Sequence, residues 1–252
     1  MTLRAALLYS LISLLVGCVS SGNVDPMKTE QGRAEARDAY VQLGIGYLQQ
    51  GATERAKGPL KKALQLDPAN ADAHAALALV FQAEMEPKLA DQHFRQALSQ
   101  RSQDPRFLNN YGSFLFEQKR YEDAYERYQQ AAADTLYQDR SRVFENLGMT
   151  ALKLDQRDKA KQYFEHSLRL NKQQPRGLLE MAVLSFEDHD YVPAQEYYED
   201  YSQLAGQTAR SLLLGTRLAT IYDDRNKAAS LGLQLRRLYP GTPEHQQYQV
   251  EQ

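Results

Sequence analysis

Several residue types are scarce in this chain of 252 residues. One cysteine cannot form an internal disulfide, and 14 glycines with 9 prolines are too few for the many turns of sandwiches or barrels. The net charge is −2, from 30 basic and 32 acidic residues, so no nucleic-acid partner is expected. Tryptophan is absent, but 16 tyrosines and 8 phenylalanines supply large side chains. With 42% hydrophobic and 25% charged residues, the composition is that of a globular domain or a repeat array.

Long hydrophobic runs are also missing, apart from one at the N-terminus. Ala5 to Val16 forms a stretch of 12 residues, interrupted by two serines and preceded by Arg4. As a helix it would span about 18 Å, which is short of the roughly 30 Å hydrocarbon core of a bilayer. The sequence therefore predicts a secretory signal peptide over residues 1–17 and not a membrane-spanning helix.

The single cysteine follows this run, in the sequence Leu15-Val16-Gly17-Cys18. This tetrapeptide resembles the bacterial lipobox, and the resemblance implies that the chain is cut before Cys18 and that this cysteine carries a covalent lipid. No other cofactor is expected. The alternative is a buried free cysteine, which is a common fate for this residue.

The residues after the cysteine bear on localisation. In lipoproteins of double-membrane bacteria, Asp directly after the cysteine is the usual signal for retention in the inner membrane, and here that position is Val19. We therefore expect lipid anchoring in the outer membrane, with the folded part facing the periplasm. Residues 18–36 are mostly polar and contain Gly22 and Pro26, so they are predicted to form a flexible tether.

A period of 34 residues organises the rest of the chain. Counted from Arg37, position 8 is Gly or Ala in the first five repeats and position 20 is Ala in all six, while positions 4, 7, 11 and 24 are mostly large. This pattern resembles the tetratricopeptide repeat (TPR), a helical hairpin. It implies an all-α, right-handed superhelical solenoid of about six hairpins, followed by a C-terminal tail over residues 243–252. The predicted repeats are 37–70, 71–104, 105–140, 141–174, 175–208 and 209–242.

Two positions depart from this pattern. Pro59 falls inside the second helix of the first repeat and is expected to kink that helix or end its first part. Ser102 stands where the second repeat would usually have Pro, so an extended exit from this repeat is expected.

No constellation of catalytic residues stands out. The five histidines show no helix-ligand spacing, and neither HExxH, GxSxG nor a phosphate-binding glycine loop occurs. His74 falls on a packing position of the second repeat. The sequence therefore predicts a protein that is not an enzyme, with no metal site and no small-molecule substrate.

The first helix of each TPR hairpin lines the concave groove of the family. On this basis the groove starts apolar and becomes mixed in polarity, and an aliphatic segment of a partner would suit it. The residues predicted to bind the partner are Val41, Ile45, Leu48, Leu79, Asn109 and Phe116. In the alternative, the tether or the C-terminus covers the apolar strip. The basic clamp of chaperone-binding TPRs is not expected, because Val41 and Ile45 replace its Lys and Asn.

Several segments resemble the type IV pilus biogenesis lipoproteins of the PilF/PilW family, the pilotins of the pilus secretin. They are EARDAYVQLGIGYLQQG, ADAHAALALVFQAEMEPKLAD, LNNYGSFLFEQKRYEDAY, SRVFENLG, ARSLLLG and LQLRRLYPG. The resemblance implies that the protein binds secretin subunits and promotes their localisation and multimerisation in the outer membrane. The alternative is a periplasmic TPR scaffold that regulates cell-wall enzymes or outer-membrane protein assembly.

Overall fold

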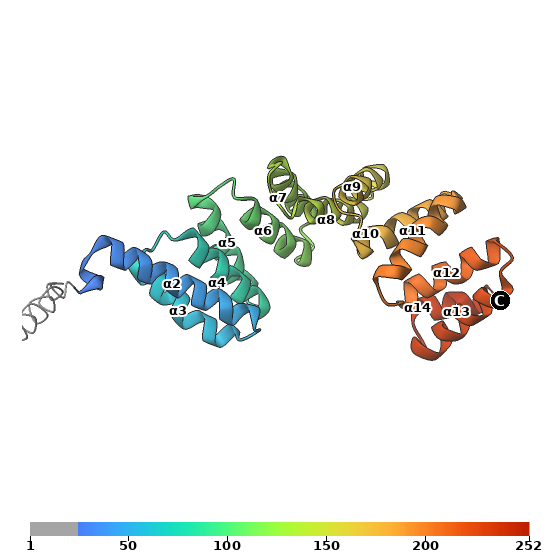
Figure 1. Cartoon of the computed structure of the whole chain (residues 1–252), viewed down its shortest axis with the longest axis horizontal. Helices are drawn as coiled ribbons and strands as arrows, with labels where there is room; N and C mark the ends of the chain where they lie inside the picture. Colours follow the sequence, from blue (N-terminus) through green and yellow to red (C-terminus); the bar gives the residue numbers. More distant parts are fainter. Residues whose placement is uncertain (1–24, 252) are drawn as a thin grey trace, which may run out of the picture. The chain divides into compact units, whose positions relative to one another are not determined.

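Residues 25–251 are described by a computed structural model, in which this part of the chain is helical and contains no strand (Figure 1). The predicted all-α fold is therefore confirmed. A short 3₁₀ helix, η1 (Pro26–Lys28), comes first. The α-helices that follow are α2 (Glu30–Gln49), α3 (Thr53–Leu66), α4 (Ala71–Ala83), α5 (Pro87–Gln100), α6 (Pro105–Glu117), α7 (Tyr121–Ala133), α8 (Arg140–Lys153), α9 (Arg157–Leu170), α10 (Pro175–Glu187), α11 (Tyr191–Leu204), α12 (Ala209–Ile221), α13 (Arg225–Leu238) and α14 (Pro243–Val250).

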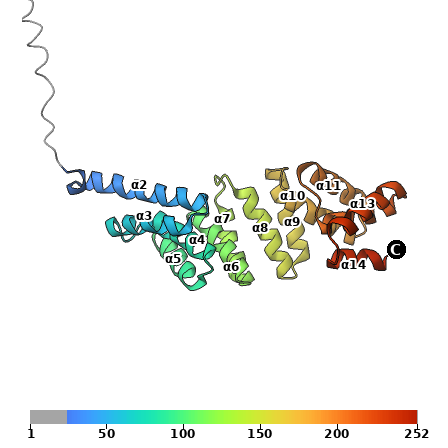
Figure 2. The ribbon, with the colours of Figure 1, turned by 90° about the horizontal axis from the view of Figure 1, so that it is seen from below.

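Consecutive helices pair into hairpins, from α2 with α3 to α12 with α13. Figure 2 shows α2 and α3 side by side. Each hairpin turn contains one residue with a positive φ, and these six residues share position 15 of the 34-residue repeat. They are Gly51, Met85, Lys119, Asp155, His189 and Asp223. A left-handed residue ends the first helix of a hairpin and turns the chain toward the second.

Small residues allow the two helices of a hairpin to approach closely. A Cβ atom added to Gly44 in α2 would lie 2.5 Å from the Leu60 side chain of α3. A Cβ added to Gly148 in α8 would lie 2.5 Å from the Phe164 ring of α9. The small residue at position 8 is thus required by the large side chain that fills the space above it.

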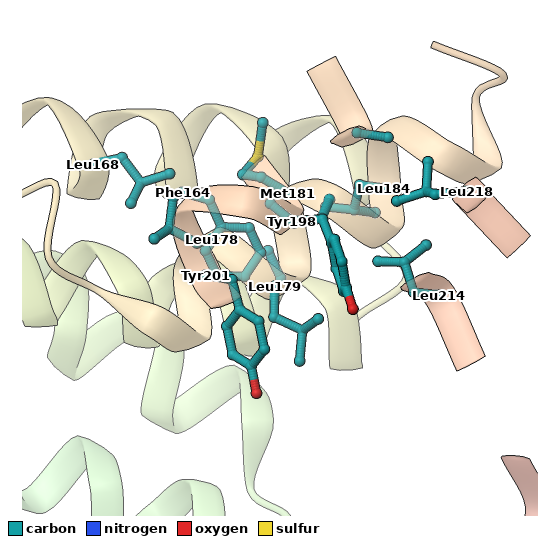
Figure 3. Close-up of a cluster of buried hydrophobic side chains, with 14 residues drawn as sticks. Phe164, Leu168, Leu178, Leu179, Met181, Leu184, Tyr198, Tyr201, Leu214 and Leu218 are labelled. Carbon is teal, nitrogen blue, oxygen red and sulfur yellow. The ribbon is translucent and has the colours of Figure 1, made fainter. Parts of the chain in front are cut away.

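The chain divides into two compact units between Gln100 and Arg101. Unit 1 contains α2 to α5, and unit 2 contains α6 to α14. The division falls in the connection after α5, where Ser102 predicted an extended exit. In unit 2, Phe164, Met181 and Tyr198 belong to one cluster of buried side chains that joins α8 to α12 (Figure 3).

The predicted tether is wrong in its last part. Helix α2 begins at Glu30, seven residues before the first predicted repeat. Thr29 caps it, because its Oγ1 accepts a hydrogen bond from the amide of Gly32 at 2.9 Å. The predicted signal peptide, Cys18 and the first part of the predicted tether lie outside the described residues.

The predicted C-terminal tail is instead a helix, α14, which packs against α12 and α13. Tyr248 of α14 is 5% exposed and lies in one cluster with Leu212 and Leu235. The guanidinium of Arg217 pairs with the carboxylate of Glu251, with Nε 3.0 Å from Oε2. Through these contacts α14 covers the last hairpin, which α12 and α13 form.

Pro59 does not end its helix, because α3 runs without a break from Thr53 to Leu66. The proline removes one backbone hydrogen bond. Ala56, Leu60 and Ala63, which flank it, are fully buried, and this packing holds the helix together.

Candidate protein-binding surfaces

The apolar strip predicted for the groove lies on α2 and α4 of unit 1, but one of its members is a core residue. Val41 is 4% exposed and packs in a buried cluster with Ala63 and Ala73. Its side chain therefore stabilises the packing of α2 on its neighbours and offers little surface to a partner. In this respect the sequence-based assignment was wrong.

The other three residues of the strip are half-buried and offer part of their surface to solvent. Ile45 and Leu48 of α2 pack against a cluster that includes Ala76 and Val80 of α4. Leu79 of α4 is half-buried and is not a member of that cluster. We call Ile45, Leu48 and Leu79 the aliphatic strip of unit 1.

The predicted residues of unit 2 have a polar environment. Asn109 of α6 is 8% exposed, and its Oδ1 accepts a hydrogen bond from Nδ2 of Asn146 in α8 at 3.1 Å. Oδ1 of Asn146 in turn accepts from Nη2 of Arg176 in α10 at 2.7 Å. A chain of hydrogen bonds therefore links the first helices of three successive hairpins.

Arg176 is held in place from a second side. Its Nη2 atom lies 2.9 Å from Oε2 of Glu145, a carboxylate that is 6% exposed as a residue. Oε1 of Glu145 accepts from the amide of Gly177 at 2.9 Å. Because the carboxylate is buried and paired, the Arg176 side chain is oriented while about half of it remains exposed to solvent.

Asn146 and Arg176 line a hollow of about 340 Å³ in unit 2. The ring of Phe116 lies edge-on to Tyr121 at 5.2 Å between centroids. The hydroxyl of Tyr128 donates to Oγ of Ser113 at 3.1 Å, and burial raises the pKa of Tyr128 to about 12. The residues that line the hollow are Ser113, Phe116, Glu117, Tyr128, Asn146, Met149 and Arg176. An extended peptide could place an apolar side chain on Phe116 and a polar group toward Arg176.

Of the predicted residues, Phe116 lines this hollow and Asn109 is hydrogen-bonded to Asn146 at its wall, whereas Asn146 and Arg176 were missed. Asn146 occupies position 6 of its repeat, whereas the six predicted groove residues occupy positions 5, 9 and 12. Arg176 occupies position 2 of the fifth repeat, which in the TPR family also points into the groove, so applying the family's groove positions to the fifth repeat would have found it.

A second hollow of about 320 Å³ lies among α9, α10 and α11 of unit 2. Leu168 and Leu178 form its apolar part, and four charged side chains stand at its edges. Burial, together with nearby carboxylates that include Glu165, raises the pKa of Tyr197 at its wall. The charged residues of this hollow are Glu165, Arg169, Lys172 and Asp200.

His74 is buried, as its packing position indicated, and it contacts a second histidine. Its Nδ1 lies 2.9 Å from Nδ1 of His93, and its Nε2 lies 3.0 Å from the carbonyl oxygen of Pro68. The His93 ring also stacks on Phe81 at 5.3 Å. Burial and the neighbouring His74 lower the pKa of His93 to about 4. Between residues 25 and 251, no three His, Cys, Asp or Glu side chains are placed to hold a metal ion.

The membrane anchor expected at Cys18 lies in the part of the chain that is not described. Across residues 25–251, none of the helices has the length and apolar character needed to cross a bilayer.

Comparison with known families supports the repeat assignment. A model of the tetratricopeptide repeat family matches residues 103–173. A solved structure from work on the functional characterisation of Pseudomonas aeruginosa PilF has a TM-score of 0.86 and 62% identity, and covers 88% of this chain and 100% of that one. The structure of PilW, described as a widely conserved type IV pilus biogenesis factor, has a TM-score of 0.72 and 27% identity, over 84% of this chain and 98% of the other.

Two curated proteins are also similar in sequence. An uncharacterised protein of Haemophilus influenzae is 32% identical over 130 residues, which are 52% of this chain and 73% of the relative. The type IV pilus assembly protein PilF of Pseudomonas aeruginosa is 61% identical over 251 residues, covering 100% of both chains. This chain therefore belongs to the family of the type IV pilus assembly protein PilF.

Proposed function

We propose that this protein serves type IV pilus biogenesis as a pilotin, which binds secretin subunits and promotes their localisation and multimerisation in the outer membrane. Family membership supports the role in the pilus system. The observation that carries the proposal is the aliphatic strip of unit 1, where Ile45, Leu48 and Leu79 keep part of their apolar surface exposed on the first helices of two hairpins. Partner segments with aliphatic anchors bind such surfaces.

The lipid anchor completes the proposal. A lipid on Cys18 would keep the protein at the outer membrane, facing the periplasm, and would raise the local concentration of any bound client there. Cys18→Ala is expected to leave the helical content unchanged and to mislocalise the secretin. Normal secretin multimers in the outer membrane of the Cys18→Ala strain would contradict the anchoring role.

Leu79 provides the sharpest test of the strip, because it is half-buried and lies outside the core cluster that Ile45 and Leu48 contact. Leu79→Glu should weaken capture of the secretin by about tenfold or more, since each tenfold change corresponds to about 1.4 kcal/mol of binding free energy. The matched control is Leu233→Glu on α13, where the leucine is 56% exposed and lies in unit 2. Far-ultraviolet circular dichroism checks that both variants remain folded.

The measurement is crosslinking in cells followed by purification of the protein with its partners. Recovery of the secretin with the wild type and the Leu233→Glu variant, and its loss with Leu79→Glu, supports the proposal. Equal recovery with both variants would remove the strip from the binding site. Recovery of peptidoglycan synthases or outer-membrane assembly factors in place of the secretin would favour the scaffold function.

A further inference from the structure

The first hairpin leaves exposed a surface that corresponds to buried positions in the later repeats. Leu43, at position 7 of the first repeat, is 46% exposed. In the second repeat, the equivalent Leu77 packs in one buried cluster with Ala56 and Leu60 of the hairpin before it. The same position is buried in the other repeats, as Tyr111, Leu147, Met181 and Gly215. No preceding hairpin covers Leu43 in the described part of the chain.

Aromatic and basic side chains surround Leu43 on this surface. Tyr40 and Tyr47 lie on the same face of α2, since residues three and four apart are neighbours on a helix. From α3, the Arg55 guanidinium lies 4.3 Å from the centroid of the Tyr47 ring, and its Nη2 donates to the Tyr47 hydroxyl at 3.1 Å. The Lys62 ammonium lies 5.4 Å from the centroid of the Tyr40 ring. We call Tyr40, Leu43, Tyr47, Arg55 and Lys62 the end patch.

We infer that the end patch contacts the phospholipid surface of the membrane to which the protein is anchored. Tyrosine has an apolar ring and a polar tip, and it is enriched where protein meets the membrane interface. Lysine and arginine place their stems along apolar surface and their charges in the headgroup layer, where anionic lipids attract them. The end patch combines these two kinds of side chain around one exposed leucine.

The position of the patch in the chain favours the membrane over other occupants. The inference rests on the anchor at Cys18 that we proposed above. Eleven residues lead from Cys18 to Thr29, and a chain of that length spans at most about 40 Å. Leu43 lies about 20 Å along α2 from Glu30, given a rise of about 1.5 Å per residue. A lipid on Cys18 therefore keeps the end patch within reach of the bilayer.

The absence of tryptophan and the single cysteine allow a direct test. The chain from Cys18 onward is coupled through its one thiol to a maleimide phospholipid in vesicles of phosphatidylethanolamine and phosphatidylglycerol. Leu43→Trp then supplies the sole tryptophan. The matched control is Val192→Trp on α11, where the valine is 62% exposed in unit 2. The readouts are the emission maximum and its quenching by phospholipids brominated on their acyl chains.

On attachment to vesicles, the emission of Trp introduced by Leu43→Trp is expected to shift to the blue and to be quenched by the brominated lipid. The Val192→Trp control should change in neither respect. Unchanged emission from the Leu43→Trp protein on attachment would overturn the inference. Emission that is already blue-shifted in solution and does not respond to vesicles would also overturn the inference, because the end patch would then be covered by another part of the protein. If dilution reverses the blue shift, a second copy covers the patch. If dilution does not reverse it, the upstream segment of the same chain covers the patch.

A charge variant tests the contribution of the headgroups. Lys62→Glu in the Leu43→Trp background should reduce the quenching on vesicles with phosphatidylglycerol and have a smaller effect on pure phosphatidylcholine. An equal effect on both lipids would contradict the role of Lys62 in headgroup contact. Because the coupling is chemical and no secretin is present, these results do not depend on lipidation in the cell or on client capture by the aliphatic strip.

Discussion

The two units are built from the same hairpin but present different chemistry on their first helices. In unit 1, Gly44 packs against Leu60, and in unit 2, Gly148 packs against Phe164 with the same close approach. The exposed parts differ. Unit 1 offers the aliphatic strip, whereas unit 2 offers the hydrogen-bonded chain of Asn109, Asn146 and Arg176 beside an aromatic hollow.

This comparison separates what the repeat determines from what it leaves variable. Positions inside the hairpin are restricted by steric fit, so the same small and large residues recur in both units. Residues at groove positions need only keep the protein soluble and fit the partner that they bind. The two units are therefore suited to different contacts with a partner, the first through apolar burial and the second through hydrogen bonds and charge.

The largest expected difference between the units concerns their ion pairs. Glu180 in unit 2 is 4% exposed, and Arg210 holds it with two hydrogen bonds, of which Nη2 to Oε2 is 2.9 Å. Arg210→Ala would leave a buried carboxylate without its partner and should lower the free energy of unfolding by about 3 kcal/mol. In unit 1, Lys57 pairs with Glu84 at 3.0 Å, and the Glu84 side chain is 19% exposed, so the carboxylate that Lys57→Ala leaves behind can be reached by water and the variant should have a smaller effect.

Urea denaturation of both variants measures this difference. The double variant Glu180→Gln with Arg210→Ala should recover part of the loss, because no charge then remains buried. Equal losses for Arg210→Ala and Lys57→Ala would show that burial of Glu180 does not distinguish the two ion pairs.

The second prediction concerns the pH dependence of unit 1. The pKa of His93 is lowered to about 4 in the folded chain, so the unfolded chain binds more protons between pH 6.5 and 4. The contribution of this group to stability is therefore full above pH 6.5 and is lost as the pH falls toward 4. The loss is at most about 3 kcal/mol, and partial exposure of the ring reduces it.

His93→Gln removes this titration and keeps a donor near Nδ1 of His74, so the slope of unfolding free energy against pH should flatten between pH 6.5 and 4. His166→Gln in unit 2 is a comparison variant, which shows how much of the pH dependence comes from the other unit. The pKa of His166 is lowered by burial and by nearby Arg169 and Arg140, so this residue contributes to the pH dependence of stability with the same sign.

Hydrogen exchange at pH 7 and pH 4.5 locates the loss of stability in the structure. If α4 and α5 were as well protected at the lower pH, the histidine pair would not be the cause.

The third prediction tests the steric rule that both units share. Gly44→Ala and Gly148→Ala each place a Cβ 2.5 Å from a fully buried side chain and should cost about 1–3 kcal/mol. Gly46, on the same helix as Gly44, has open space around it, so Gly46→Ala should stabilise the protein by about 0.5–1 kcal/mol. Thermal unfolding compares the three, and a loss at Gly46 as large as that at Gly44 would contradict the steric explanation.

The hairpins could be predicted from the sequence because their interior packing requires small and large residues at fixed positions of the repeat. The ends of the array were harder to predict. Residues 30–36 and 243–250 are helical although they lie outside the repeat, and the signals for them are local, as in the caps formed by Thr29 and Thr242. A repeat pattern cannot predict these terminal helical segments, because it describes only the features that recur along the chain.

The binding surfaces were predicted in part, for a physical reason. Groove positions were assigned from the repeat alone, and a repeat position does not report how far neighbouring helices cover it. Val41 was therefore taken for a surface residue although α3 and α4 bury it. Asn146 joins the surface through hydrogen bonds to Asn109 and Arg176 in the two neighbouring hairpins, and no single repeat contains these contacts.

The smallest expected effects on stability lie in the hairpin turns. There the two units share a backbone conformation but differ in the residue that adopts it. Gly51 in unit 1 has a φ of 72°, and Lys119 at the same repeat position in unit 2 has a φ of 60°. Residues other than glycine pay about 1 kcal/mol in this region, so Gly51→Ala should destabilise the protein by about that amount. Lys119→Gly should relieve the strain and stabilise the protein by less than about 1 kcal/mol, because glycine also gains freedom in the unfolded chain. Thermal unfolding should thus show shifts of opposite sign, and shifts of one sign would mean that side-chain contacts at these turns outweigh backbone strain.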